Sequence, residues 1–252
     1  MFHLKNISKS LPDKSLILSD ISFDLQPGSF YSLIGSNGTG KSTLLRIIGG
    51  LLRPDTGSIY YENRLLSGTN LKSLFNQVHY LYQSRDENLS PSLTLKELIA
   101  LSITNHRSNF FYLNYRLLNE TIVDSLASMN LGLEKKINQP VKTLSGGEFQ
   151  AASILILSEI IKSKPKLEHL VLLDEHTSHL DNEMTSVVMK MSQSLATVNN
   201  AAVLIVPHNL TLAIKYSDHI LVLRKSQITE TLNVSECGNQ LDIQMLEKML
   251  FK

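Results

Sequence analysis

The side chains with the clearest chemical potential stand in one glycine-rich run. Residues 35–42 read Gly-Ser-Asn-Gly-Thr-Gly-Lys-Ser, between the strand-like stretch 30–34 and a helix-like stretch that begins near Lys41. Glycines let the backbone take positive φ and approach a ligand closely, so consecutive N–H groups can point at phosphate oxygens from the positive end of a helix. Lys41 would then reach the β- and γ-phosphates, and the Ser42 hydroxyl would bind Mg²⁺. A chance glycine-rich turn is the alternative, but it does not explain the strand-then-helix context.

A pair of carboxylates follows a second apolar stretch. Residues 170–173 are all apolar, and Asp174 and Glu175 come directly after them. Open α/β sheets bind ligands at the carboxyl ends of their strands, so this pair stands where a nucleotide site is expected. We expect Asp174 to hold Mg²⁺ and Glu175 to orient or deprotonate water. Capping of the next helix is the structural alternative.

A histidine at the end of another strand completes this set. His208 follows the apolar run 203–206, and there an imidazole can bond the γ-phosphate and position Glu175 and water. The alternative is an ordinary polar residue with a satisfied hydrogen bond. Gln83, shortly after Tyr80, reads as a surface glutamine unless its place at a strand end brings it to the site.

The elements that position these residues predict a parallel α/β architecture. Residues 1–34 read as a small β sheet, and further strands are expected at 58–61, 78–82, 170–173 and 202–206. The runs at 170–173 and 202–206 are continuously apolar, as strands buried on both faces are. Apolar residues at helical spacing predict a mostly helical lobe within 92–140, and 226–252 reads as a short strand or turn followed by an amphipathic helix.

Composition narrows the class of protein. The 252 residues are 42% hydrophobic and 19% charged with a formal net charge of +1, which gives no electrostatic case for nucleic acid as a partner. The single cysteine, Cys237, excludes an intrachain disulfide and suits a reducing compartment. No apolar run reaches the roughly 18 residues of a membrane span, so any work at a membrane is expected to be peripheral.

Several of these residues together carry a family resemblance. Residues 144–148 read Leu-Ser-Gly-Gly-Glu, about thirty residues before the carboxylate pair, and 178–181 and 206–209 follow as Ser-His-Leu-Asp and Val-Pro-His-Asn. In this order they resemble the ATPase subunit of an ATP-binding cassette (ABC) transporter over nearly the whole chain. The resemblance implies a P-loop NTPase core with a mainly parallel sheet, an N-terminal antiparallel β subdomain and a helical lobe that carries residues 144–148, the signature.

The resemblance also implies one domain, 1–252, with the core at about 1–91 and 160–225, the helical lobe at about 92–159 and a C-terminal extension at 226–252. ATP and Mg²⁺ are the implied cofactors. Gln83 would reach the metal and the attacking water, and the loop after it would touch the transmembrane partner. The implied catalytic residues are Glu175, His208 and Gln83, and the implied metal ligands are Ser42, Gln83 and Asp174. The nucleotide would contact Gly35, Ser36, Asn37, Gly38, Thr39, Gly40, Lys41, Ser42 and Thr43 from one subunit.

Across a head-to-tail homodimer, Ser145 and Gly147 would contact the γ-phosphate held by the other subunit, and Asp181 would lie at the interface. By itself, Ser145-Gly146-Gly147 also reads as a turn and a helix N-cap. The implied partners are integral membrane permease subunits and an extracytoplasmic substrate-binding protein, at the cytoplasmic face of the inner membrane. Residues 131–134 and 174–177 are similar to those of a bacterial uptake subgroup, some of whose members carry amino acids.

Three rival functions stay open at this stage: an exporter ATPase, a permease-free ABC ATPase that acts on nucleic acid or ribosomes, and a metabolic kinase. The second usually needs a long coiled-coil insertion or two cassettes in one chain, and this sequence has neither a sustained heptad segment nor a second glycine-rich run of this type. A kinase would leave the signature and His208 unexplained.

The chain departs from the family pattern at three positions. Leu11 stands where most members stack an aromatic ring on adenine, so apolar contact or another aromatic such as Tyr31 would have to serve. His176 replaces a common proline beside Glu175, and His179 replaces a common alanine. An imidazole at 176 is either structural or a titrating group that makes turnover sensitive to pH.

Overall fold

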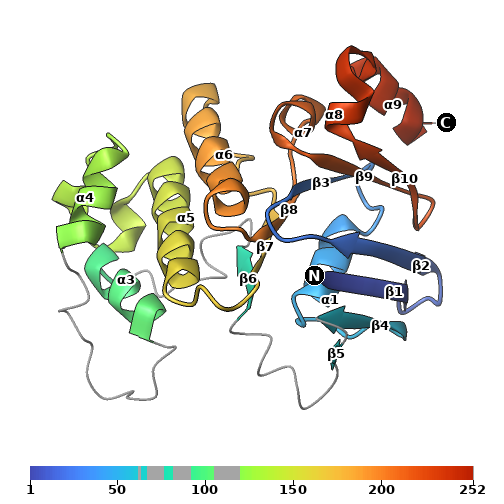
Figure 1. Ribbon diagram of the computed structural model, residues 1–252, viewed down its shortest axis with the longest axis horizontal. Helices are drawn as coiled ribbons and strands as arrows, with labels where there is room; N and C mark the ends of the chain where they lie inside the picture. Colours follow the sequence, from blue (N-terminus) through green and yellow to red (C-terminus); the bar gives the residue numbers. More distant parts are fainter. Residues whose placement is uncertain (62–63, 67–76, 82–91, 105–119, 252) are drawn as a thin grey trace.

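A computed structural model describes residues 1–61, 64–66, 77–81, 92–104 and 120–251. Within these ranges the chain forms two sheets with helices on their faces (Figure 1). The larger sheet has six strands in the order β10-β9-β3-β8-β7-β6, and only the β10–β9 pair is antiparallel. Its strands are β3 (Phe30–Ile34), β6 (Val78–Leu81), β7 (Leu170–Asp174), β8 (Ala202–Val206), β9 (His219–Arg224) and β10 (Gln227–Asn233).

Strands β7 and β8 of this sheet are buried on both faces. In β7, Leu170 and Leu172 pack on one side while Val171 and Leu173 pack on the other, because successive side chains of a strand point to opposite faces. The continuous apolar runs in the sequence follow from this double burial. The carboxyl ends of the parallel strands therefore meet at one edge, where Asp174, Glu175 and His208 begin their loops.

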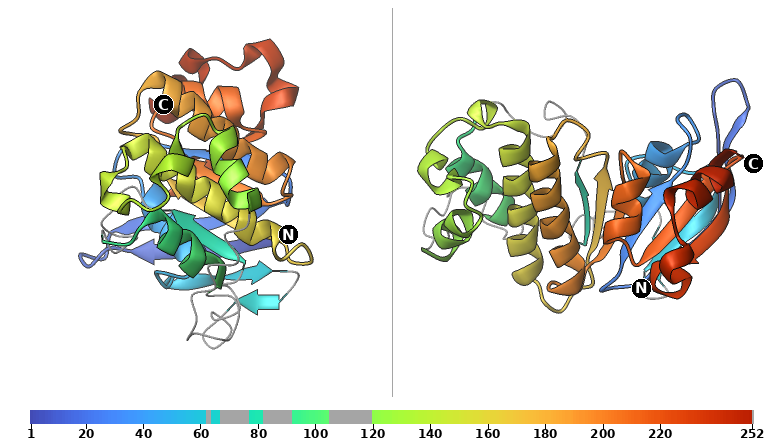
Figure 2. Two further views of the ribbon diagram at one scale, coloured as in Figure 1. Left: turned by 90° about the vertical axis from the view of Figure 1, so that its left-hand side faces the viewer. Right: turned by 90° about the horizontal axis from the view of Figure 1, so that it is seen from above.

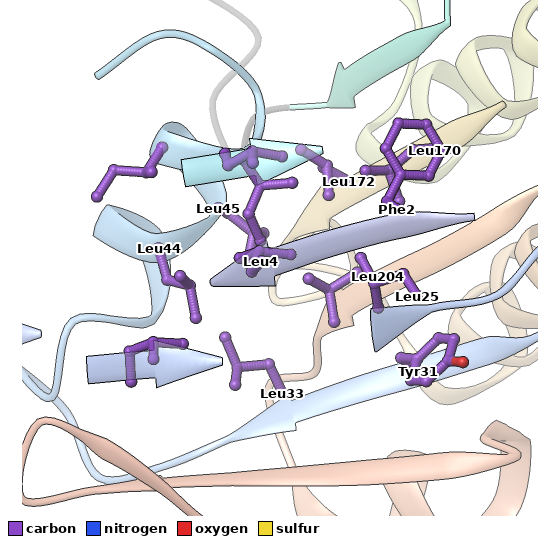
Figure 3. Packing of buried hydrophobic residues seen from close by; sticks show 14 of the residues in the cluster. Phe2, Leu4, Leu25, Tyr31, Leu33, Leu44, Leu45, Leu170, Leu172 and Leu204 are labelled. Atoms are coloured by element: carbon purple, nitrogen blue, oxygen red, sulfur yellow. The ribbon is translucent and has the colours of Figure 1, made fainter. Parts of the chain in front are cut away.

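The smaller sheet is antiparallel and lies at the N-terminus. Its order is β2-β1-β4-β5, with β1 (Phe2–Ser10), β2 (Leu16–Leu25), β4 (Thr56–Tyr61) and β5 (Arg64–Leu66). Helix α1 (Lys41–Ile48) and this sheet share one hydrophobic core with β3, β7, β8 and β9. Figure 3 shows Leu4, Leu45 and Leu172 meeting in this core from the small sheet, α1 and the large sheet.

Helices cover the opposite face of the large sheet. Helices α5 (Gly146–Lys162) and α6 (Asn182–Thr197) lie side by side there and bury Ile154 and Met189 against β7 and β8 (Figures 1 and 2). Beyond α5 lie α3 (Leu95–Thr104) and α4 (Glu120–Ser128), with short 3-10 helices at Leu133–Lys136 and Val141–Thr143. These elements have their own apolar cluster, which includes Leu95, Leu126 and Phe149.

The C-terminal segment packs on the β9 end of the large sheet. After α7 (Leu210–Tyr216), β9 and β10 come α8 (Val234–Cys237), a 3-10 helix (Gly238–Gln240) and α9 (Ile243–Phe251). Leu246 of α9 is fully buried with Ile220 and Val222, so α9 is amphipathic as predicted. Among the described residues, no helix is both long and apolar enough to cross a membrane. The predicted fold class, α/β with a mainly parallel sheet, an antiparallel N-terminal sheet and a helical lobe, is confirmed.

Candidate nucleotide-binding site

The glycine-rich run forms a loop between β3 and α1. Gly38 and Gly40 have φ of 80° and 100°, in the region that favours glycine, and Gly40 precedes α1 without any side-chain cap on the helix. The N–H groups of the first turn of α1 are therefore directed toward the loop, as in helix N-termini that bind anions. Thr39 supports the loop internally, because its hydroxyl donates to the Ser36 carbonyl at 2.9 Å.

Lys41 folds back over this loop. Its Nζ donates to the carbonyl oxygens of Gly35 at 2.8 Å and Ser36 at 3.0 Å. Burial lowers the pKa of Lys41, while the nearby carboxylates of Glu175 and Asp174 act in the opposite direction. These carbonyl bonds hold the ammonium group at the loop, where incoming phosphate oxygens can replace the carbonyls as its acceptors.

Asp174 joins α1 to the sheet through both of its carboxylate oxygens. The Ser42 hydroxyl donates to Oδ1 at 3.1 Å, and the Tyr80 hydroxyl donates to Oδ2 at 2.9 Å. Ser42 and Asp174 together offer only oxygen atoms, which suits Mg²⁺. Their 3.1 Å separation is close to the ~3.0 Å expected between neighbouring ligands of an octahedral Mg²⁺ with ~2.1 Å bonds. The residues at this position therefore fit the metal that the sequence predicts.

Glu175 has an unusual backbone for a glutamate. Its φ is 45°, in the left-handed region, and its N–H donates to the Val206 carbonyl at 3.1 Å. That bond ties the end of β7 to the end of β8, and Ser178 N–H in turn donates to the Glu175 carbonyl at 3.0 Å. These two hydrogen bonds within the chain thus stabilise a strained residue at the edge where the ligand is expected. Strained residues of this kind are typical of functional sites.

His208 is exposed, and both of its ring nitrogens have hydrogen-bond partners. Asn209 caps α7, because its Oδ1 accepts from Leu212 N–H at 3.0 Å, so its Nδ2 is the atom that donates to His208 Nε2 at 2.8 Å. Neutral His208 therefore carries its proton on Nδ1, which lies 3.1 Å from Thr177 Oγ1. To bond a γ-phosphate, the ring must exchange one of these two partners.

These residues surround a polar cavity of about 510 Å³. Four separate segments contribute residues to it: β2, the glycine-rich loop with the start of α1, the end of β7 and the end of β8. The described residues that line it are Ile17, Asn37, Gly38, Gly40, Lys41, Ser42, Thr43, Glu175 and His208. Asp174 lies beneath it, 92% buried. The structure thus brings together the loop residues, the carboxylate pair and the histidine that the sequence singled out.

A second cavity of about 480 Å³ adjoins the first, and Ile17 and Thr43 line both. Leu11 lines the second cavity together with Leu52 and the Lys9–Asp55 ion pair, whose atoms lie 2.6 Å apart. Leu11 is 43% exposed, so it can give a nucleobase apolar contact although it has no aromatic ring.

Tyr31 cannot replace the missing aromatic residue, contrary to the option raised by the sequence. Its side chain is buried, its ring stacks on His219 with centroids 4.8 Å apart, and its hydroxyl accepts from Gln26 N–H at 3.1 Å. These contacts hold the ring in the interior of the protein. Sequence reasoning missed this because Tyr31 adjoins the glycine-rich run, whereas its strand directs the side chain into the core.

The predicted residues of the signature lie elsewhere. Ser145 caps α5, accepting from Glu148 N–H at 3.2 Å, and Asp181 caps α6, accepting from Met184 N–H at 2.8 Å. Gly147 is covered by Met184, so the first turns of α5 and α6 are in contact. Among the described residues, none of the signature lines the nucleotide cavity of its own chain.

Four further residues near the strand ends differ in how they relate to the predicted site. Gln83 lies outside the described residues. Sequence reasoning missed Tyr80 and Thr177, which hold Asp174 and His208. Only their places at or just after strand ends could have pointed to them, since Tyr80 is the penultimate residue of β6. His179 is exposed and does not line this cavity.

A glycine-rich loop between β3 and α1, with a polar cavity at the strand ends, defines a P-loop nucleotide-binding protein. The model of the ABC transporter family matches residues 18–178. A tyrosine transport ATP-binding protein of Clostridioides difficile is 31% identical over 98% of both chains. The chain belongs to the ABC transporter family and is its ATP-binding and ATP-hydrolysing subunit.

One further relative is similar in sequence, and two solved structures are similar in fold. The petrobactin import ATP-binding protein YclP of Bacillus subtilis is 29% identical over 91% of this chain and 86% of its own length. The ATP-binding subunit of an ABC transporter superposes with a TM-score of 0.78 at 22% identity, with full coverage of both chains. A dimeric ATP-binding cassette bound to ADP and Pi superposes with a TM-score of 0.74 at 24% identity, over 93% of this chain and 99% of its own.

Proposed function

We propose that this chain powers a solute importer as a head-to-tail homodimer, with ATP and Mg²⁺ held at two shared sites. The observation that carries the proposal is the separation of two half-sites within one chain. Lys41, Ser42 and Glu175 line a phosphate cavity, whereas Ser145 lies at the start of α5 and does not line that cavity. A helix N-terminus binds anions, so the start of α5 is suited to a phosphate held by a second chain.

In the proposed reaction, this chain contributes positioning and charge. Lys41 and the N–H groups that begin α1 neutralise the developing charge on the transferring phosphoryl group, and Glu175 takes the proton of the attacking water. Ser42, Asp174 and Gln83 would hold Mg²⁺, which would supply positive charge to neutralise the phosphate oxygens. His208 orients Glu175 and the water from the end of β8.

We assign the division of labour along the chain as the sequence predicted it. Residues of about 1–91 and 160–225 form the nucleotide core with its β subdomain, about 92–159 form the helical lobe, and 226–252 form a C-terminal extension. The separate apolar clusters of the helical lobe and of the C-terminal segment support this division. Asp181, at the head of α6, lies at the proposed dimer interface beside the signature.

The proposed assembly places two copies of this chain at the cytoplasmic face of the inner membrane, bound to integral membrane permease subunits. An extracytoplasmic substrate-binding protein would deliver the solute. Support comes from two relatives, named for tyrosine transport and for petrobactin import. The relative named for tyrosine transport matches across 98% of both chains, so an amino acid is the proposed solute class.

Uptake measurements test this proposal. Cells that carry this chain should accumulate labelled tyrosine, and replacement by a Lys41→Ala chain should reduce that uptake at least about tenfold, because the phosphates lose their cation. The Lys142→Ala variant, at an exposed lysine outside the cavity, is the matched control and should transport normally.

Two outcomes would contradict the importer. Unchanged uptake of amino acids together with loss of drug or solute efflux in the Lys41→Ala cells would indicate an exporter. Copurification of the chain with ribosomes or nucleic acid, and not with a multi-span membrane protein, would indicate a permease-free ATPase.

A further inference from the structure

The first turn of α5 is closed by a reciprocal pair of hydrogen bonds. Ser145 Oγ accepts from Glu148 N–H at 3.2 Å, and Glu148 Oε2 accepts from Ser145 N–H at 2.9 Å. This capping box fixes the Ser145 hydroxyl and the Glu148 carboxylate relative to each other. The orientation of Ser145 therefore depends on where the Glu148 side chain lies.

Glu148 is held from the other side by a lysine twelve residues earlier. Lys136, the last residue of the 3-10 helix Leu133–Lys136, donates from Nζ to Glu148 Oε1 at 2.7 Å. The Glu148 side chain is 14% exposed and that of Lys136 is 33% exposed, so the pair is only partly open to solvent. Burial alone would raise the pKa of Glu148, but the bonds from Lys136 and Ser145 outweigh burial and lower the pKa. The carboxylate is therefore ionised at neutral pH.

A carboxylate is a poor group to bring near a triphosphate. In the proposed dimer, the turn that begins at Ser145 faces the γ-phosphate on the other chain, so Glu148 adds a negative charge close to several others. Like charges that lie close together repel strongly where water is excluded. The ion pair with Lys136 cancels that charge without disturbing the oxygen that Ser145 N–H requires.

We propose that Lys136 is a positioning residue for ATP-driven dimerisation. It neutralises Glu148 and keeps the Ser145 turn in the orientation that binds the phosphate of the other chain. The inference rests on the proposed homodimer. It adds to that proposal a residue outside the glycine-rich run, the carboxylate pair and the signature.

Dimerisation in a hydrolysis-deficient background tests the inference. In a Glu175→Gln chain with saturating ATP and Mg²⁺, Lys136→Ala should weaken the dimer about tenfold or more, measured as the monomer–dimer Kd by analytical ultracentrifugation. The matched control is Lys135→Ala, the exposed neighbour in the same short helix, which should leave the Kd unchanged. ATP affinity of the monomer should be the same in all three chains.

A rescue separates charge from structure. Glu148→Gln keeps a side-chain oxygen for the Ser145 N–H and removes the charge, so the pair of changes Lys136→Ala and Glu148→Gln should return the Kd to within about twofold of the background. The defect of Lys136→Ala alone should shrink as salt is raised, because salt screens repulsion.

Equal Kd values for Lys136→Ala and Lys135→Ala would overturn the inference, and so would a defect that Glu148→Gln does not repair. If the Glu175→Gln chain binds ATP but stays monomeric, the proposed dimer itself fails, and this inference fails with it.

Discussion

His176 is a buried histidine directly after the proposed base, Glu175. The Ser192 hydroxyl donates to the Val188 carbonyl at 2.8 Å, so His176 Nε2 must be the donor in its 3.1 Å contact with Ser192 Oγ. Its Nδ1 is buried and, among the described residues, has no hydrogen-bond partner. Burial, and secondarily the nearby His208, lower the pKa of His176 to about 3. The ring is therefore neutral at physiological pH, and the hypothesis that its titration makes turnover sensitive to pH is not supported.

The low pKa of His176 has a consequence for stability instead. An unfolded histidine has a pKa near 6.5, so between that value and about 3 the unfolded chain binds more protons than the folded one. Stability contributed by neutral His176 is therefore present above pH 6.5 and is lost as pH falls. His176→Gln should reduce the pH slope of the unfolding free energy between pH 6 and 5 by about 1 kcal/mol per pH unit.

Urea unfolding at several pH values measures this slope, and His169, whose pKa is also lowered by burial, contributes equally in both chains. The pH profile of kcat between 6 and 8 should be the same in both. Identical unfolding slopes, or a displaced kcat profile, would show that His176 titrates in the folded protein.

Helices α5 and α6 meet at a glycine. A Cβ on Gly147 would overlap the side chain of Met184, in the first turn of α6. Gly147 is therefore required for helix packing as well as for its proposed approach to phosphate. The first turn of α6 is also the one that Asp181 caps, so packing at Gly147 links the signature to the residues after β7.

Gly147→Ala should lower the unfolding free energy by about 1–3 kcal/mol, because Met184 must move out of its place. In a Met184→Ala background the same change should cost at least about 1 kcal/mol less, since the obstacle is gone. Chemical denaturation of the four chains gives this coupling energy. An equal cost in both backgrounds would mean that Gly147 is not in contact with Met184 in solution.

Local patterns predicted most of the elements that support the site. The apolar runs of β7 and β8 and the glycine-rich run placed the strands, α1 and the carboxylate pair correctly, because burial on both faces and phosphate binding each leave a continuous signal. The contact between Lys136 and Glu148 depends on how a 3-10 helix packs on α5. No pattern within either segment encodes that packing, so sequence reasoning missed it. The three-residue strand β5 was missed because it is too short to show alternation.

At the scale of the whole molecule, the proposed dimer divides each nucleotide site between two chains. The cavity at the carboxyl ends of β3, β7 and β8 has the cation, the hydroxyl and the carboxylates for a nucleotide, while Ser145 and Gly147 begin α5 outside it. Two copies arranged head to tail would complete both sites at once. ATP would then act as the link between the chains, and its hydrolysis would release them.

The most direct test of this account is the oligomeric state of the Glu175→Gln chain. With Mg²⁺ and ATP it should elute as a dimer in size-exclusion chromatography with light scattering, holding two nucleotides per dimer, because the water is no longer activated and the link persists. With ADP it should be a monomer, and Ser145→Ala in the same chain should prevent the dimer. A Glu175→Gln chain that is saturated with ATP and yet monomeric would contradict the account.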